Sequence, residues 1–441
     1  MRLPPRRRAS GCAVPPAPRR PAPSESTNVT SERVLYVGLA SQPGAPVAAA
    51  LLKLVRQGVM ESGEFAYGRH YLNTPGAQPL NPLHMPLGAG VTPLGPSRLR
   101  DGGALPLTLR DALPDAWGRR VLEAQHGREL ADADVLLLTN DDRIGAMVFG
   151  ASLPLQPGEP VQPVQPVHSL QALADAAQAL EAGREPSPEM KRLLQGGGSL
   201  GGARPKATFV HEGLRYMAKF PSRGDTHDVE VLEAGTTALA RLCGITVADF
   251  FLQPLHRGHA LVLRRFDRIG LFDGERRLHY LSASAVLDVP YESSDGSYVA
   301  LAQALRQISA DPVADLQQLF RRLVFNLAVD NSDDHIKNHG LLRDGNRWRL
   351  APAFDLVMQL SNLGYQSLAI VPGRLESHMD RVREAAPQFG LSPAQAQALA
   401  EEVVDTVHTQ AAWTLQAHGA GKPLVAQALA CLQRQADLIG L

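Results

Sequence analysis

Short apolar runs separated by Pro and Gly mark the first two thirds of the chain, whereas apolar residues at helical spacing dominate the last third. Alternation of apolar and polar positions predicts strands, and recurrence every three to four positions predicts helices. Residues 47–57 are apolar, but their periodicity leaves strand and helix open. We expect strands at 34–39, 64–72, 207–210, 214–220, 247–253 and 259–266, a turn into a strand at 142–149, and helices at 107–125, 168–183, 230–243, 301–308, 316–329, 399–415 and 424–438. This order predicts an α+β protein that ends in an α-rich lobe.

Local composition divides the chain into segments. Residues 1–32 combine many Arg and Pro with hardly any large apolar residue, and such a segment cannot bury enough surface to offset its ordering entropy. We therefore expect a disordered basic tail there. The remaining segments that we expect are a small α/β N-terminal subdomain at 33–155, a Gln/Pro/Val-rich linker at 156–167, a strand-rich lobe at 168–270 and an α-rich lobe at 271–441.

Overall composition narrows the class of protein. The 441 residues carry a formal net charge of zero, so the whole molecule is not a general binder of polyanions. Three widely separated cysteines indicate neither a disulfide framework nor a zinc site, which fits a reducing cytosol. No apolar run reaches the roughly eighteen residues that a membrane-spanning helix needs. We expect a soluble, cytoplasmic protein that does not insert into a membrane.

The most informative stretch is 326–356, where a polar loop precedes a strand hairpin hinged at Asp344-Gly345-Asn346. Folding the hairpin brings Asp355 beside Asp333 and Asn338. Two carboxylates and an amide oxygen suit Mg²⁺ carried on nucleotide phosphates, because this ion prefers oxygen ligands and keeps several that are not from protein. Asp-x-x-x-x-Asn followed by a later Asp is also the arrangement of protein-kinase catalytic loops.

Simpler explanations exist for the same residues. Asp, Asn and Ser gather in turns because their side chains hydrogen-bond nearby backbone, so Asp-x4-Asn alone has little weight. Asp334 is a rival to Asp333 for the role of base. Counting back five positions from Asn338 selects Asp333, which leaves Asp334 to hydrogen-bond locally.

A second candidate feature is the Gly-rich stretch 196–207, followed by two strand-like runs. Glycines allow backbone N–H groups to approach phosphate oxygens, although such runs are usually flexible linkers. Alternation in the second run places Tyr216, Ala218 and Phe220 on one face and Met217 with Lys219 on the other. Lys219 is then either a solvated edge residue or a phosphate ligand. Glu233, near the start of a predicted helix, either pairs with Lys219 or is favoured there by the helix dipole.

Taken in order, these motifs resemble the HipA family of toxin kinases. The resemblance rests on Ser199-Leu-Gly-Gly-Ala-Arg-Pro-Lys206, Ala218-Lys219-Phe-Pro, Arg265-Phe-Asp-Arg268, Asp333-Asp-His-Ile-Lys-Asn338 and Ala351-Pro-Ala-Phe-Asp355-Leu. Phe65-Ala-Tyr67, Leu113-Pro-Asp-Ala-Trp-Gly and Asp142-Arg-Ile-Gly-Ala are similar to the N-terminal subdomain of that family. The likeness covers about residues 33–440, and it implies a two-lobed protein-kinase-like fold with a serine/threonine-protein kinase activity that uses ATP and Mg²⁺.

The resemblance also implies individual roles. It makes Asp333 the base that accepts the substrate hydroxyl proton, and His335 a catalytic-loop histidine near the phosphates. It makes Ser199 the site of an inactivating autophosphorylation, which fits the repulsion between a new dianion and ATP. The implied nucleotide ligands are Gly201, Gly202, Ala203, Arg204, Pro205, Lys206, Lys219, the backbone of Arg264 to Phe266, His335, Asn338 and Asp355, of which Asn338 and Asp355 hold Mg²⁺. Arg264 departs from the family, which often has an acid there.

The implied partners are a protein substrate from the translation machinery, such as an aminoacyl-tRNA synthetase, and a helix-turn-helix antitoxin through which DNA is reached only indirectly. Two alternatives remain open. One is a lipid or small-molecule kinase, since Asp-x-His-x-x-Asn also resembles the catalytic loop of phosphoinositide kinases. The other is a mainly non-catalytic co-repressor of a DNA-binding antitoxin. The later helices supply scaffold, in which we expect His408 and Trp413 to be packing residues.

Overall fold

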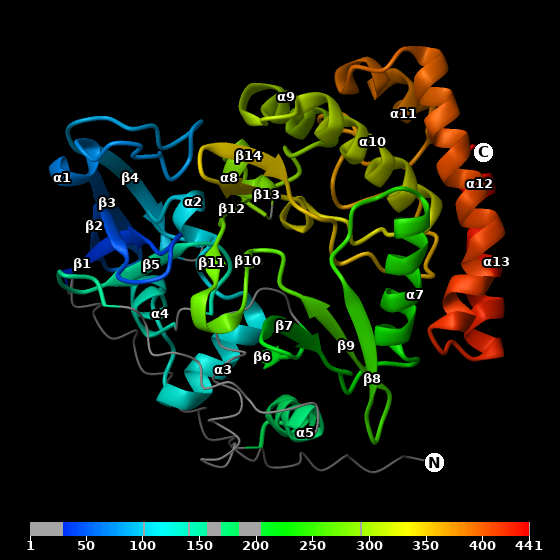
Figure 1. Cartoon of the computed structure of the whole chain (residues 1–441), viewed down its shortest axis with the longest axis horizontal. Helices are drawn as coiled ribbons and strands as arrows, with labels where there is room; N and C mark the ends of the chain where they lie inside the picture. Colours follow the sequence, from blue (N-terminus) through cyan, green and yellow to red (C-terminus); the bar gives the residue numbers. More distant parts are fainter. Residues whose placement is uncertain are drawn as a thin grey trace, which may run out of the picture.

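The computed structural model describes residues 30–99, 102–139, 142–156, 169–184, 204–291 and 293–440. The Gly-rich stretch up to Ala203 lies outside these residues, as does nearly all of the predicted linker. Of the predicted tail, only the last residues are described, and they belong to a strand that begins at Thr30. Figure 1 shows a sheet subdomain, a second sheet and a helical lobe following one another across the molecule, with the N-terminal subdomain on the left.

The N-terminal subdomain is built on a five-stranded antiparallel sheet in the order β4-β3-β2-β1-β5. Alternate residues of its second strand, such as Leu52 and Leu54, are buried because side chains alternate across a sheet. The apolar run 47–57 is therefore a strand. The elements are β1 (Thr30–Leu39), β2 (Val47–Gln57), β3 (Met60–Tyr67), α1 (Arg69–Leu72), β4 (Thr92–Arg98), α2 (Leu107–Arg110), α3 (Ala116–His126), α4 (Asp132–Leu138) and β5 (Met147–Gly150).

The second sheet has four antiparallel strands in the order β6-β7-β9-β8 and is covered by a helix on each face. Alternation along β9 decides the packing: Ala260 and Val262 contact the side of α5, whereas Leu261 and Leu263 contact α7. α7 begins at its N-cap Asp228, whose carboxylate accepts from Val231 N–H at 3.2 Å. The elements are α5 (Ser169–Glu181), β6 (Lys206–His211), β7 (Leu214–Lys219), α7 (Val229–Leu242), β8 (Phe250–Pro254) and β9 (His259–Arg264).

The C-terminal lobe packs six α-helices, among the described residues, around a small sheet in the order β12-β13-β14. Its largest apolar cluster centres on α10, which Asp311 and Pro312 start as N-cap and first residue. Figure 1 shows α12 and α13 side by side at the right edge, with α12 lying against α7. The elements are β10 (Arg268–Ile269), η3 (Phe272–Gly274), β11 (Arg276–Arg277), β12 (His279–Ser282), α8 (Ala283–Leu287), α9 (Tyr298–Ile308), α10 (Pro312–Ala328), η4 (Ile336–Asn338), β13 (Gly340–Asp344), β14 (Arg347–Leu350), α11 (Met379–Ala385), η5 (Ala386–Phe389), α12 (Pro393–Ala417) and α13 (Lys422–Ile439).

Three local expectations were wrong. The strand predicted at 64–72 ends at Tyr67, and a short helix replaces its second half. The single helix predicted at 107–125 is two helices, because Pro114 has no N–H to donate and disfavours helical backbone in the residue before it. Trp413, predicted to be a packing residue, is 60 % exposed on α12, and His408 is exposed as well.

Among the described residues, no helix combines the length and the apolar character that crossing a membrane requires.

Candidate functional site

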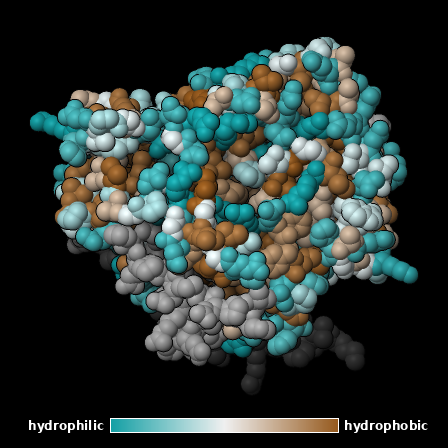
Figure 2. Space-filling model, in the orientation of Figure 1, coloured by the Kyte–Doolittle hydropathy of each residue, from teal (hydrophilic) through white to brown (hydrophobic). Residues whose placement is uncertain are grey.

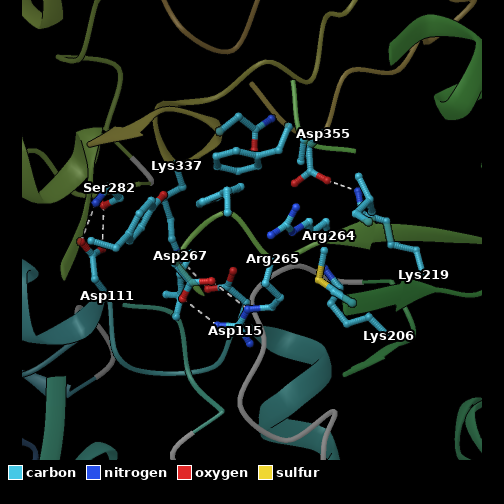
Figure 3. Close-up of a pocket in the computed structure, with 18 of the residues that line it drawn as sticks. Asp111, Asp115, Lys206, Lys219, Arg264, Arg265, Asp267, Ser282, Lys337 and Asp355 are labelled. Carbon is cyan, nitrogen blue, oxygen red and sulfur yellow. Dashed lines mark hydrogen bonds and ion pairs between the residues drawn. The ribbon is translucent and has the colours of Figure 1, made fainter. Parts of the chain in front are cut away.

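A pocket of about 180 Å³ lies where the three parts of the molecule meet. Figure 2, in the orientation of Figure 1, shows apolar surface near the middle of the face in view, interrupted by hydrophilic side chains. Figure 3 shows that charged side chains from all three parts point into the pocket. The lining residues are Asp111, Leu113, Asp115, Ile144, Lys206, Met217, Lys219, Ala248, Leu263, Arg264, Arg265, Phe266, Asp267, Tyr280, Ser282, His335, Lys337, Asn338, Phe354 and Asp355.

Lys219 is the centre of the charged groups in this pocket. Alternation in β7 turns Ala218 toward α5 and its neighbour Lys219 toward α7, as the sequence predicts. The Lys219 ammonium lies 2.5 Å from Glu233 Oε1 in α7 and also donates to Asp355 Oδ1, an interaction drawn in Figure 3. The ion pair with Glu233 that the sequence left open is present.

Burial and charge compete in this triad. Burial alone would lower the pKa of Lys219, but the carboxylates of Asp355 and Glu233 outweigh it and raise that pKa. Burial alone would raise the pKa of Asp355, but the ammonium groups of Lys219 and Lys206 hold that pKa below its ordinary range. Glu233 is the most enclosed of the three and keeps a raised pKa because of its burial. At neutral pH, Lys219 and Asp355 are therefore charged.

Asp355 adopts an unusual backbone conformation, with φ of 54°. Left-handed backbone is uncommon for a residue other than Gly, and it persists where the surrounding structure fixes it. The backbone two residues earlier is held by the strand-rich lobe: Ala353 forms an isolated bridge with Val247 and donates its N–H to Thr246 O at 2.8 Å. The side chain of Asp355 remains 38 % exposed and lines the pocket, so one carboxylate contacts Lys219 and is also accessible to a ligand.

The loop after α10 presents the other predicted residues. A short 3₁₀ turn, Ile336–Asn338, is closed by the bond from Asn338 N–H to His335 O at 2.8 Å. The Asn338 amide also donates to Asp333 O at 3.3 Å, which leaves its own oxygen for a ligand. His335 and Asn338 line the pocket, and the edge of Tyr291 packs on the His335 ring with 4.9 Å between centroids.

The two neighbouring acids in this loop differ in environment. Asp334 is buried, accepts hydrogen bonds from Tyr298 Oη and from His339 Nε2 at 3.0 Å, and so acts as an internal anchor. Asp333 is exposed and, unlike His335 and Asn338, does not itself line the pocket. Partial desolvation raises its pKa, while the nearby His335 opposes that rise. Accessibility therefore agrees with the sequence argument that selects Asp333 rather than Asp334.

The residues of the predicted phosphate loop have different positions. Lys206 lines the pocket, whereas Arg204 does not. The Arg204 guanidinium pairs with both oxygens of Asp225, at 2.9 and 2.7 Å, and with Glu230 at 2.7 Å. Pro205 contributes its carbonyl to Phe220 N–H at 2.9 Å. The predictions for Ser199, Gly201, Gly202 and Ala203 fall outside the described residues.

The segment proposed for adenine, Arg264 to Phe266, also lines the pocket. Arg264 N–H donates to Asp249 O at 2.8 Å and Arg265 N–H to Arg215 O at 3.0 Å, so both are used within the protein. Phe266 N–H has no hydrogen bond to any of the described residues, and the Phe266 ring packs 5.6 Å from that of Phe354. Phe266 is thus the backbone donor of this segment that is available to a base.

Sequence reasoning missed the wall that the N-terminal subdomain contributes. Asp115 contacts Lys337 of the catalytic loop, and Asp111 accepts from Ser282 N–H at 2.7 Å and Ser282 Oγ at 2.6 Å. Gly145 N–H donates to Asp267 Oδ2 at 2.8 Å. The motifs Leu113-Pro-Asp and Asp142-Arg-Ile-Gly had marked the subdomain, but no local pattern indicates that they border the site.

Nor did the sequence reveal the buried ionic cluster behind Phe266. Asp267 bonds to Arg265 at 2.7 Å and to Arg268 at 2.5 Å. Burial works against its charge, but the two guanidinium groups hold the pKa of Asp267 well below the usual range. Arg265 also donates to Asp142 O at 2.7 Å, so the cluster joins the N-terminal subdomain to the strand-rich lobe. It fixes the segment that carries Phe266.

Two parts of the sequence match known protein domains. Residues 51–150 match the HipA N-terminal domain, and residues 198–411 match the HipA-like C-terminal domain. The chain belongs to the HipA family. The order of motifs in the sequence had indicated the same family, and both of its domains are present.

Individual HipA relatives are distant. The chain is 33 % identical over 159 residues to a Sinorhizobium fredii protein provisionally named kinase Y4mE, and 25 % identical over 185 residues to the serine/threonine-protein kinase toxin HipA of Shewanella oneidensis. These alignments span 35 % and 36 % of this chain, and only 36 % and 42 % of the respective relatives.

A solved structure supports the HipA fold over a greater length. The HipA chain in a complex of Shewanella oneidensis HipA, HipB and operator DNA superposes with a TM-score of 0.64 at 17 % identity. The superposition covers 92 % of this chain and 98 % of that one. The predicted two-lobed, kinase-like α+β fold is confirmed.

Proposed function

We propose that the chain is an ATP- and Mg²⁺-dependent serine/threonine-protein kinase of the HipA type. The observation that carries the proposal is Lys219, which lies between Glu233 and Asp355 in a pocket that also contains His335 and Asn338. A lysine that pairs with a helix acid and reaches nucleotide phosphates is a required part of kinase sites. The kinase names of the relatives agree with this function.

The pocket fits a nucleotide at both ends. Phe266 offers a backbone N–H and an aromatic ring for the base, next to the apolar side chains of Leu263 and Ile144. Lys206 and Lys219 supply positive charge for phosphate oxygens. We expect the predicted Gly201–Lys206 loop to cover those phosphates through its backbone N–H groups.

The donor set also fits Mg²⁺ that arrives with ATP. Among the described residues, no cluster of three or more His, Cys, Asp or Glu could hold a metal by itself. The Asp355 carboxylate and the Asn338 amide oxygen would provide two hard donors, and the nucleotide phosphates and water would supply the remaining ligands. When bound, the ion neutralises charge on the transferring phosphoryl group.

We assign the role of base to Asp333. Its side chain is exposed, so the hydroxyl of a polypeptide can approach it. It takes the hydroxyl proton as the oxygen bonds to the γ-phosphorus and the bond to the β-phosphate oxygen breaks, which yields phosphoprotein and ADP. Proton transfer of this kind contributes roughly 10²–10⁴-fold to a rate.

The biological part of the proposal comes from the family. We propose a cytoplasmic toxin that phosphorylates a component of translation, such as an aminoacyl-tRNA synthetase, and is held by a helix-turn-helix antitoxin that contacts DNA. The complex of the Shewanella oneidensis HipA with HipB and operator DNA supports the partner assignment. Autophosphorylation of Ser199 would place a dianion beside the phosphate cradle, repel ATP and silence the enzyme.

Transfer of radiolabelled phosphate from ATP tests the proposal. Wild type with Mg²⁺ should label Ser199 and a protein in a cell extract, and Asp333→Ala should label neither. Asp380→Ala serves as the control, because Asp380 is an exposed acid on α11 that does not line the pocket. Absence of protein labelling by wild type would refute the protein kinase, and labelling of a lipid or metabolite instead would identify the alternative acceptor.

A further inference from the structure

We propose that Asp115 of the N-terminal subdomain is a positioning residue, whose carboxylate holds the catalytic turn of the C-terminal lobe in place through Lys337. This inference rests on the proposed kinase activity, and it explains how a subdomain outside the two kinase lobes controls the reaction. The contact joins residues 222 positions apart in the chain.

Asp115 is the N-cap residue of α3, so it occupies a fixed point at the start of a helix rather than a long loop. Its Oδ1 accepts from Lys337 Nζ, and both side chains are about one-third exposed, at 33 % and 30 %. The contact is thus a salt bridge between two partly buried side chains of opposite charge.

The turn that carries Lys337 is anchored on one side by Ile336, which is buried in the core of the C-terminal lobe, but its own backbone hydrogen bonds are few. Three residues of 3₁₀ helix are held by one bond of 2.8 Å, from Asn338 N–H to His335 O. The second bond, from the Asn338 amide to Asp333 O, is long at 3.3 Å. Short 3₁₀ segments have poor hydrogen-bond geometry, so the external contact at Lys337 adds a constraint on where His335 and Asn338 point, beside the buried Ile336.

A second contact from the same N-terminal segment also joins the subdomain to the residues around the catalytic turn. Asp111, four residues before Asp115, accepts from both Ser282 N–H and Ser282 Oγ, as drawn in Figure 3. Ser282 ends β12 and pairs with Gly340, which begins the strand after the catalytic turn. The segment 111–115 thus contacts the turn at Lys337 and the strand pair that follows it.

Loss of the contact between Asp115 and Lys337 should lower the rate of phosphoryl transfer more than it weakens nucleotide binding. A misplacement of about 1 Å at a reacting group costs on the order of 10²-fold in rate. Asp115→Asn keeps the side-chain size and a good N-cap residue while removing the charge. We expect kcat to fall roughly 10- to 100-fold with KM for ATP changed less than about threefold. Asp115→Glu, which keeps the charge, should recover part of the rate.

A double-mutant cycle separates positioning from a direct effect of the Asp115 charge on ATP. If Asp115 acts through Lys337, Asp115→Asn should have no further effect in a Lys337→Met background. Asp132→Asn is the matched control, since Asp132 pairs with Arg119 in the same subdomain and does not line the pocket. Multiplicative losses in the double variant, or a change in KM alone, would overturn the inference.

Hydrogen exchange at residues 335–338 gives a readout that does not require activity. Asp115→Asn should speed exchange of the Asn338 amide roughly tenfold, while the amides of α10 stay as protected as in wild type. If wild type transfers no phosphate, the kinase proposal fails while exchange still decides whether Asp115 holds the turn. An unchanged exchange rate of the Asn338 amide in Asp115→Asn would refute the inference, even if the enzyme is active.

Discussion

Replacing Lys219 by Met should destabilise the protein in a manner that depends on pH. In wild type, Glu233 is only 3 % exposed and has the Lys219 ammonium 2.5 Å away as its counter-charge. The variant leaves that carboxyl buried without a cation, and the cost of an uncompensated buried charge is about 3–5 kcal/mol. Asp355 loses the same partner, but its 38 % exposure lets water solvate it.

The size of the effect follows from the proton that Glu233 must take up. Its pKa is already raised by burial, and loss of Lys219 raises it further. If the carboxyl stays neutral in the folded protein, the folded state loses about 1.36 kcal/mol of stability for each pH unit above the unfolded pKa of about 4.3. This loss amounts to about 4 kcal/mol at pH 7.5 and to under about 2 kcal/mol at pH 5.5. Because the folded variant binds the extra proton, its stability rises as pH falls.

Urea unfolding of wild type and Lys219→Met from pH 5.5 to 7.5 measures this difference. The raised pKa of Lys219 keeps its ammonium charged throughout, and this counter-charge opposes proton uptake by Glu233 in wild type. The gap between the two proteins should therefore shrink by about 2–3 kcal/mol on acidification. Adding Glu233→Gln to the variant should restore most stability at pH 7.5 and remove the extra pH dependence. A gap that stays constant with pH would refute the reasoning, whatever its size. Lys53→Met, which breaks an exposed pair with Glu32, is the control and should change little.

Two further predictions concern the scaffold. Gly235→Ala should lower the free energy of unfolding by about 1 kcal/mol or more despite the better helix propensity of Ala, because a Cβ there would lie 2.7 Å from Leu415 Cδ2 and 3.0 Å from Leu415 Cα; equal or higher stability in urea would contradict the close packing of α7 on α12. Cys243 and Cys431 are free and buried, and burial raises the pKa of each thiol to about 12. Neither should therefore react with a thiol-specific reagent at pH 8 until urea unfolds the protein, and prompt reaction of either in the native protein would contradict that burial.

Local chemistry made many of the strands, and some residues that line the pocket, predictable. The two-residue period of β7 places Lys219 on the face opposite Ala218, and the structure adds that this face meets α7, where Glu233 lies 14 positions later. The Asp344-Gly345 turn, with Gly345 at φ of 62°, folds β13 onto β14 and returns the chain toward Asp355. These signals are strong because each depends on a few adjacent residues.

The N-terminal wall of the site could not be predicted in this way. Contacts such as Asp115 with Lys337 depend on how the three parts of the molecule pack, and an acid at the start of a helix, such as Asp115, looks the same in sequence whether it faces solvent or a pocket. Tertiary context also decided the exposure of Trp413, since α12 is covered on one side only. A large aromatic residue at helical spacing does not by itself show which side is covered.

The charges of the pocket explain why a chain with no net charge can present a site for a polyanion. Asp355 pairs with Lys219, Asp115 with Lys337 and Asp267 with Arg265, so three of the four acids that line the pocket already have cations. The fourth, Asp111, accepts hydrogen bonds from Ser282, and burial raises its pKa to about 6. Lys206 has no ion pair with any described residue, and burial lowers its pKa to about 8. A bound nucleotide would supply the counter-charge that Lys206 lacks and restore its full ionisation. The local arrangement of partners, rather than the overall charge balance, therefore makes this pocket complementary to phosphate.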